Sequence, residues 1–462
     1  MGNSNGVRHS PKGLLINRVT GKVSTTRDYG RKVDGIRWPG DPNGPIRTHP
    51  EPSGGAVVTE PAAVDLLDID PDFGSDPYRA YAVLRARGPV HEIRAGEKDR
   101  FWLVVGHDAC REALTDPRLS RDWPRNGHLA TGLEAPPATD GPGNAHMLLS
   151  DPPDHTRLRR LAARAFTPRR VAALAPRIQD VTDALMTAML AAEDRRADLV
   201  DALAYPLRMT VICELLGIPD LDRDVFRGWS DEITAPTGAE AARAAQAEAV
   251  PYLGGLIAAK RAAPADDLLS DLIHTVDEDG DRMSEDELLS MALLLLLAGH
   301  ESTVNFLCKG VRALFAHPDQ FALLRSDLDG LVEGAVEEML RYDAPVETAP
   351  PRVAVEPVEI GGRSVPAGAV VLIALGDAGR DPARFTAPDR FDIRRTGTVD
   401  RGHLAFGHGI HYCLGAPLAR LEGRIVFRTL LSRCPTLGPD GRPGGRFSGL
   451  LAQGERKVPV RW

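Results

Sequence analysis

The chain has 462 residues, of which 43% are hydrophobic and 26% charged, a composition typical of a soluble globular protein. Its formal net charge of −8 argues against a nucleic-acid partner, because surfaces that bind nucleic acid are basic. The five cysteines are an odd number and widely spaced, which excludes a disulfide framework and predicts a reducing, cytoplasmic compartment. The longest purely apolar run, residues 291–299, is shorter than the about 20 residues that span a bilayer, and we expect no membrane anchor.

The first 60 residues differ from the rest of the chain. Residues 1–50 contain nine Lys or Arg and three Asp or Glu, and Gly, Pro, Asn and Ser dominate without apolar periodicity. This composition predicts a disordered basic extension over residues 1–60. A partner-binding tail is the alternative interpretation. We expect a single folded domain over residues 64–462.

The folded part begins with a helix and a strand pair. Asp76-Pro77 starts the helix and Gly88-Pro89 ends it. Val90–Ile93 and Phe101–Val105 have the composition of two strands. Residues 118–144 are polar and rich in Pro and Gly, which predicts a long loop, and long loops inside compact domains are usually functional.

A basic helix follows at residues 151–161, which read D-P-P-D-H-T-R-L-R-R-L. His155 and Arg159 lie four residues apart, so both point to the same side of a helix. Because guanidinium binds carboxylate through two hydrogen bonds, this pair suits a ligand with carboxylate groups. For Arg157, Arg160 and Arg164 we favour a solvated basic face or a docking surface for an electron donor.

Residues 171–274 show apolar residues at helical spacing and predict four or five helices without identifying a ligand. Residues 284–316 predict one long helix, because Ser284 and Glu287 have the spacing of a capping box at its start. The centre of this helix, residues 298–303, reads A-G-H-E-S-T.

The centre of the long helix carries an acid beside a hydroxyl. Glu301 and Ser302 are costly to bury in an otherwise apolar helix unless they serve a purpose. Ala298 and Gly299 are small and leave room for a bulky group against the backbone. The Ser302 hydroxyl can donate and accept hydrogen bonds and so pass protons. The alternative is a helix kink eased by bonding of side chain to backbone.

A Glu-x-x-Arg motif and a β unit come next. Glu338 and Arg341 share one face of a helix that we expect to begin near Leu331, and alone they fit a simple surface pair. Arg352 is predicted to open a strand. Residues 358–373 predict a further β unit with Gly and Pro at its turns.

The most informative segment is Phe406–Gly415, which reads F-G-H-G-I-H-Y-C-L-G. It places Cys413 between a glycine-rich loop and an amphipathic helix. A thiol just before a helix start lies near free N–H groups that favour the thiolate, which is either a nucleophile or a metal ligand. The alternative for a lone cysteine is a buried free thiol.

This ten-residue pattern resembles the haem-binding loop of the cytochrome P450 family. Three further segments resemble motifs of that family in the same order, at residues 151–159, 298–302 and 338–341. The resemblance covers residues 64–462. It implies a mainly α fold with a small β region, a triangular prism of helices that holds haem b between the long central helix and the cysteine loop.

The resemblance also implies roles for individual residues. Cys413 corresponds to the axial thiolate ligand of the haem iron, and Glu301 and Ser302 to the proton-delivering pair, with Ser302 where relatives have threonine. Glu338 and Arg341 correspond to a buried pair whose third member is Arg390. The residues implied to hold the haem are His155, Arg159, Ala298, Arg352, Phe406, Gly407, His411, Cys413 and Gly415.

The implied function is that of a haem-thiolate monooxygenase that hydroxylates or epoxidises a small organic substrate with O2. The chain has no nucleotide-binding motif and no cysteine cluster, so electrons would come from a separate ferredoxin and ferredoxin reductase. That ferredoxin would dock on Arg157, Arg160, Arg420 and Arg424.

The sequence resembles actinobacterial members that tailor natural products such as macrolides. The alternatives are a cytochrome P450 that couples substrates oxidatively without inserting oxygen, a non-catalytic haem sensor, and a purely structural helical protein.

Overall fold

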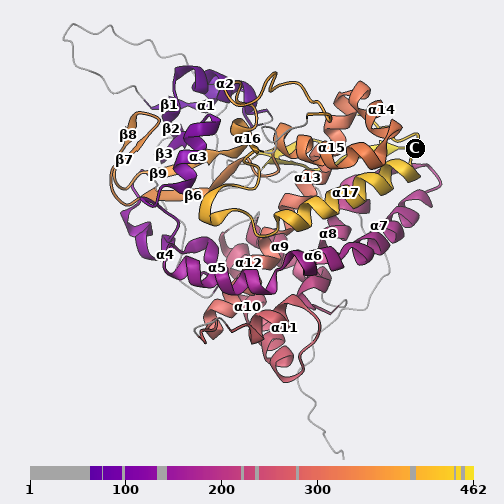
Figure 1. Ribbon diagram of the computed structural model, residues 1–462, viewed down its shortest axis with the longest axis horizontal. Helices are drawn as coiled ribbons and strands as arrows, with labels where there is room; N and C mark the ends of the chain where they lie inside the picture. The colour runs from indigo at the N-terminus through magenta and orange to yellow at the C-terminus, as the bar shows by residue number, and fades with distance from the viewer. Residues whose placement is uncertain are drawn as a thin grey trace, which may run out of the picture.

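The computed structural model describes residues 63–462 except 75, 96–98, 133–142, 220–222, 235–238, 277–279, 396–401, 442–443 and 449–452. The predicted extension over residues 1–60 lies outside the described residues. Most described residues are helical, and most strands gather on one side of the molecule (Figure 1).

A six-stranded sheet forms this β side, in the order β1-β2-β3-β9-β6-β4. The strands are β1 (Val64–Asp65), β2 (Val90–Ala95), β3 (Asp99–Val104), β4 (Leu119–Ser120), β6 (Thr348–Ala354) and β9 (Val370–Ala374). The predicted strand pair is confirmed, since β2 and β3 pair antiparallel with Val90 opposite Val104. Arg352 lies inside β6 and does not open a strand, because β6 already pairs with β9 at Thr348 and bulges between Ala349 and Arg352.

Smaller sheets use the remaining strands. These strands are β5 (Arg196–Asp198), β7 (Val358–Ile360), β8 (Arg363–Val365), β10 (Gly438–Pro439), β11 (Arg446–Ser448), β12 (Gln453–Glu455) and β13 (Pro459–Arg461). The predicted β unit at residues 358–373 is confirmed as the β7–β8 hairpin followed by β9.

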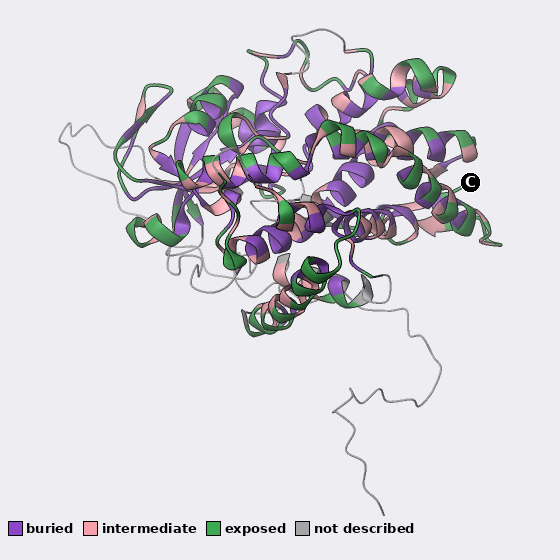
Figure 2. Cartoon of the chain, turned by 60° about the horizontal axis from the view of Figure 1, so that its bottom comes forward, coloured by how far each residue is buried: buried purple, intermediate pink, exposed green. Residues whose placement is uncertain are grey.

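Five helices contribute much of the largest apolar core cluster: α8 (Tyr205–Leu216), α12 (Glu285–Ala298), α13 (His300–Ala316), α15 (Leu328–Tyr342) and α17 (Ala416–Arg433). Helix α13 lies near the centre and packs against α8, α15 and α17 (Figure 1). Buried residues follow the inward sides of these helices, and exposed residues follow the outward sides (Figure 2).

The other helices surround this core. They are α1 (Leu66–Ile69), α2 (Tyr78–Arg87), α3 (His107–Thr115), α4 (Trp123–Asn126), α5 (Asp154–Ala165), α6 (Pro168–Ala173), α7 (Ala175–Leu190), α9 (Arg223–Thr234), α10 (Ala239–Ala262), α11 (Leu268–His274), α14 (Pro318–Ser326) and α16 (Leu375–Ala378). Four or five helices were predicted over residues 171–274. The described residues of this region form the α-helices α6 to α11, of which α6 and α7 are separated by Leu174 alone.

The predicted long helix begins as expected but is broken. Ser284 and Glu287 form the capping box. Helix α12 then ends at Ala298, and α13 begins at His300, with Gly299 between them. By length and mean hydropathy the whole stretch Glu285–Ala316 could cross a membrane, but 65% of its apolar window is buried inside the structure, as in a core helix of a soluble protein.

A buried carboxyl, Asp377, joins α2, α16 and the start of α3. It is fully buried, and it accepts hydrogen bonds from the Arg85 guanidinium and from the Gly106 N–H, the latter at 2.6 Å. Burial raises the pKa of Asp377 from 3.8 to about 6, although the positive charge of Arg85 opposes the rise.

This pKa predicts how the stability of the fold depends on pH. Because the folded pKa of Asp377 exceeds the unfolded value, its contribution is complete below about pH 4 and is lost as pH rises through about 6. The full loss is about 3 kcal/mol, at about 1.4 kcal/mol per pKa unit. In urea unfolding between pH 4 and 6, Asp377→Asn should flatten this slope, whereas the exposed-site control Asp266→Asn should leave it unchanged. Parallel wild-type and Asp377→Asn curves would refute the assignment.

Candidate functional site

The cysteine loop folds back on itself to present Cys413. The Cys413 N–H donates to the carbonyl of Phe406 at 2.9 Å. Gly407 and Gly409 have φ of 72° and 73°, a left-handed conformation that favours glycine. After the loop, the predicted amphipathic helix is confirmed as α17.

Cys413 differs from the other cysteines in its surroundings. Of the five, it is exposed and the other four are buried. Desolvation by the surrounding protein nevertheless raises the pKa of its thiol, although the N–H groups of Gly415 and Ala416 and the charges of Arg159 and Arg208 lower it. The N–H groups at the helix start therefore lower the thiol pKa, as predicted, but desolvation by the surrounding protein raises it by more. A thiol that is enclosed by protein yet exposed on one side suits a ligand that supplies positive charge.

Nitrogen-rich side chains gather near the cysteine loop. The rings of His155 on α5 and His411 lie 4.3 Å apart between centroids. His155 is 2% exposed, and neither of its ring nitrogens has a hydrogen-bond partner in the described part of the chain. Arg159 donates to the Tyr412 carbonyl at 2.6 Å. The structure thus brings three predicted residues, His155, Arg159 and His411, to one place.

Arg352 belongs to the same group. It is 4% exposed, its Nη1 donates to the Leu119 carbonyl at 3.2 Å, and its buried Nε has no partner among the described residues. Burial, with the charges of His155, Arg352, Arg121 and Arg159, lowers the pKa of His411 to about 2.

Sequence reasoning missed Arg121, which joins this group. It is 3% exposed and follows β4, which pairs with β6 next to Arg352. Within the ranges that the structure describes, no carboxylate contacts the guanidinium of Arg121 or Arg352. Burial lowers the pKa of both side chains, and the charge of the nearby Asp151 only partly opposes this effect. The signal for Arg121 is the long-range pairing of β4 with β6, which no local pattern contains.

The break in the central helix carries the predicted acid and hydroxyl. Ala298 is exposed although it lies in an apolar helix, whereas Glu301 and Ser302 are half-buried. The Ser302 Oγ donates to the Ala298 carbonyl at 3.2 Å. The side-chain-to-backbone bond expected for a kinked helix is therefore present at the predicted position.

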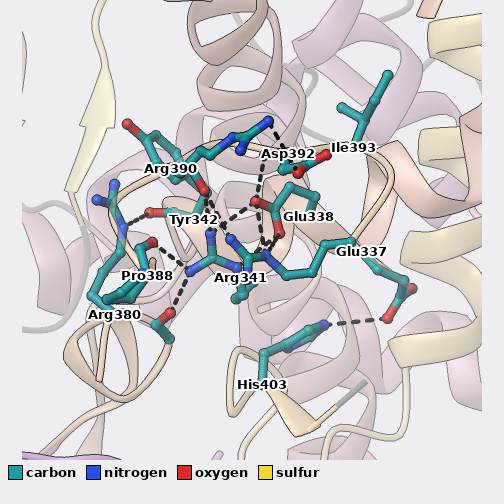
Figure 3. Close-up of polar contacts among 12 residues, drawn as sticks. Glu337, Glu338, Arg341, Tyr342, Arg380, Pro388, Arg390, Asp392, Ile393 and His403 are labelled. Atoms are coloured by element: carbon teal, nitrogen blue, oxygen red, sulfur yellow. Dashed lines mark hydrogen bonds and ion pairs between the residues drawn. The ribbon is translucent and has the colours of Figure 1, made fainter. Parts of the chain in front are cut away.

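Glu338 and Arg341 form a buried pair beside the loop that leads to Cys413 (Figure 3). Arg341 donates to both carboxylate oxygens of Glu338 at 2.8 Å, and each side chain is 1% exposed. The prediction that the Arg390 side chain is the third member of this group is wrong. Its side chain is 68% exposed and pairs with Asp392, whereas Arg395 contacts Glu338 at 3.2 Å.

The neighbouring Glu337 ties α15 to the segment before Cys413 and to α17. It accepts hydrogen bonds from His403 at 3.2 Å and from Arg420 Nε at 2.6 Å. Burial alone would raise the pKa of Glu337, but these bonds lower it to about 2. Two of the arginines predicted to dock a ferredoxin form ion pairs within the chain. Arg420 pairs with Glu337, and Arg157 pairs with Asp281 and Glu287.

Comparison with known proteins identifies this arrangement. The family model described as Cytochrome P450 matches residues 257–447. The chain is 52% identical to cytochrome P450 monooxygenase PikC of Streptomyces venezuelae over 88% of this chain and 96% of that protein. The chain belongs to the cytochrome P450 family.

Other relatives agree with this membership. The chain is 44% identical to 6-deoxyerythronolide B hydroxylase of Saccharopolyspora erythraea, over 85% of this chain and 98% of that protein. The solved structure of tirandamycin C-bound P450 monooxygenase TamI superposes with a TM-score of 0.75 at 42% identity, over 85% of this chain and 98% of that one. The cytochrome P450 fold and the enzyme class, an oxidoreductase of the monooxygenase type, are therefore those of this chain. The family implies a haem-thiolate iron cofactor.

Proposed function

We propose that residues 64–462 act as a single cytochrome P450 domain that binds haem b and uses O2 to hydroxylate or epoxidise a small organic substrate. The observation that carries the proposal is the exposed thiol of Cys413 beside a group of buried nitrogen donors that contact no carboxylate in the described part of the chain. A porphyrin with two carboxylates and a central metal satisfies both at once.

The residues in the site fit haem. The buried nitrogens of His155 and Arg352 that have no partner among the described residues could donate to carboxylates, and Arg159 and His411 lie near His155 and the cysteine loop. Cys413 would supply the axial thiolate, held by its N–H bond to Phe406. Gly415 keeps the space beside the sulfur free, because a Cβ there would lie 3.8 Å from Cys413 Sγ, and Gly407 allows the left-handed turn of the loop. Ala298 is exposed at the helix break.

Haem, when bound, supplies the iron centre at which dioxygen is activated. The chain's own part is to hold protons and exclude water. The Ser302 hydroxyl can rotate away from the Ala298 carbonyl to accept and donate a proton at Oγ, and Glu301 beside it can resupply that proton. Serine lacks the methyl group that restricts the rotamers of threonine, so this hydroxyl is held less tightly than in relatives with threonine.

The relatives support a proposal for the substrate class. PikC and 6-deoxyerythronolide B hydroxylase lie among the similar proteins, as does mycinamicin IV hydroxylase/epoxidase. We infer a secondary metabolite such as a macrolide or another polyketide, and a role in antibiotic biosynthesis in the cytoplasm. A ferredoxin with its reductase would supply the electrons and would dock on Arg157, Arg160, Arg420 and Arg424, of which Arg157 and Arg420 also form ion pairs within the chain.

Isotope labelling tests this function. The purified protein, a surrogate ferredoxin and reductase, and NADPH are incubated under 18O2 with macrolactones that shift the haem spin state. One 18O atom in the product supports the proposal, and reactions in H2 18O with unlabelled O2 should give unlabelled product. A coupled or cyclised product without 18O would favour oxidative coupling, the kind of chemistry for which the related enzyme CxnD forms a C–S bond. Tight carbon monoxide binding without turnover would favour a sensor.

The hydroxyl at position 302 gives a separate prediction. Ser302→Ala should divert electrons into hydrogen peroxide and lower product per NADPH at least about tenfold, because general acid–base groups contribute about 10²–10⁴ in rate. Ser302→Thr keeps the hydroxyl and should retain or improve the yield. Product and peroxide measured per NADPH oxidised check this. An alanine variant that couples as well as the threonine variant would exclude a proton-delivery role.

A further inference from the structure

A buried arginine, Arg208 on α8, contacts the break in the central helix. The residue is 5% exposed. Its Nε donates to the carbonyl of Gly299, and its Nη1 donates to Glu422 Oε1 on α17 at 2.9 Å. One guanidinium therefore links three elements that are distant in sequence: α8, the α12–α13 break and the helix that follows Cys413.

The break is shaped to receive this guanidinium. A Cβ atom at position 299 would overlap the Arg208 side chain, so glycine is required for the contact. The carbonyl that Arg208 binds belongs to the residue between Ala298, where α12 ends, and His300, where α13 begins. Glu301 and Ser302 follow within three residues.

Glu422 holds the guanidinium in this orientation. It is fully buried on α17, and its second oxygen, Oε2, has no hydrogen-bond partner in the described part of the chain. Burial raises the pKa of this carboxyl, whereas the charge of Arg208 and the adjacent Thr303 side chain lower it. Thr303 follows Ser302, so the acid that orients Arg208 also lies against the first turn of α13.

The geometry points to a positioning role. A pair that served stability alone needs only the bond between Arg208 and Glu422. The bond from Arg208 Nε to the Gly299 carbonyl places a charged donor at the helix break. A rotation of the Gly299 peptide there would change the directions of the Glu301 and Ser302 side chains. We propose that Arg208 is a positioning residue that fixes the Gly299 peptide, and through it the proton-delivering pair. This inference rests on the proposed function of Glu301 and Ser302.

Four variants separate positioning from charge compensation. Arg208→Met removes the donors but keeps a similar length. Arg208→Met/Glu422→Gln also removes the buried carboxylate that would otherwise be left unpaired. Arg208→Lys keeps the charge but cannot make the forked contact. The matched control, Arg177→Gln, breaks the exposed pair of Arg177 with Glu214 on the same helix α8.

The first readout is amide hydrogen exchange of peptides covering residues 298–306 in the ferric protein, without substrate or electron donor. In Arg208→Met, exchange there should be about tenfold faster than in wild type, as expected for the loss of a hydrogen bond to a charged group. The double variant should recover resistance to urea, because no buried charge is unpaired, but should keep the fast exchange. Arg208→Lys should be intermediate and the Arg177→Gln control unchanged.

The second readout is hydrogen peroxide released per NADPH oxidised, which should rise in Arg208→Met and in the double variant. The proposal is overturned if the double variant restores both the exchange protection and the low peroxide yield, because compensation of Glu422 would then be the whole role of Arg208. It is equally overturned if exchange at residues 298–306 is unchanged in Arg208→Met. Because exchange needs no turnover, a failure to find any oxygenated product would count against the proposed function and not against this contact.

Discussion

An Arg341→Ala variant is expected to give little or no folded protein. The Arg341 side chain is 1% exposed and donates to both oxygens of Glu338 and to the carbonyls of Gly379, Pro388 and Arg390. Its loss leaves a buried carboxylate and three carbonyls without these donors. Breaking a buried pair costs about 3–5 kcal/mol, a large part of the about 5–15 kcal/mol that stabilises most domains.

Soluble yield and the urea midpoint measure this effect. The matched control is Arg428→Ala, since Arg428 is 51% exposed and pairs with the exposed Asp329 at 3.0 Å. The control should change the free energy of unfolding by less than about 1 kcal/mol. Arg341→Lys should also fail, because an ammonium group cannot bind Glu338 bidentately and reach the loop carbonyls. A folded Arg341→Ala protein of near wild-type stability would contradict the role assigned to the pair.

A Cys413→Ala variant is expected to fold but to form no oxygenated product. The thiol contributes little to packing, because Cys413 is exposed, and the loop is held by backbone bonds that alanine keeps. The axial thiolate, however, is the ligand type that favours O–O cleavage, and alanine offers no metal ligand.

Product yield and haem content of the purified variant check this prediction. Cys434→Ala is the control, since Cys434 is a buried free cysteine at the end of α17. It should retain both haem and product. Loss of activity in Cys434→Ala with retention in Cys413→Ala would assign the haem ligand to Cys434 and contradict the prediction.

Features that depend on neighbours in sequence were predictable. The capping box of Ser284 and Glu287, the helix after Cys413 and the β2–β3 pair all follow from spacing and composition, and the structure has them. The pairing of Glu338 with Arg341 also follows from helical spacing, although burial of the pair was implied only by the family resemblance.

Features set by contacts between distant segments were not predictable. Arg390 and Arg395 are both arginines near the pair, and only the path of the loop brings Arg395 to Glu338. A kink near Glu301 and Ser302 was one interpretation of the sequence. The contact that Arg208 makes with the Gly299 carbonyl was not predictable, because Arg208 lies 91 residues away. Arg121 enters the site through the pairing of β4 with β6.

The central claim, a haem held by Cys413, is tested most directly by the absorption spectrum of the purified, reduced protein under carbon monoxide. A strongly red-shifted Soret band, lost in Cys413→Ala, is the result that a thiolate ligand predicts. A protein that purifies and reconstitutes without haem, or a Soret band typical of histidine ligation, would contradict the claim and the roles built on it.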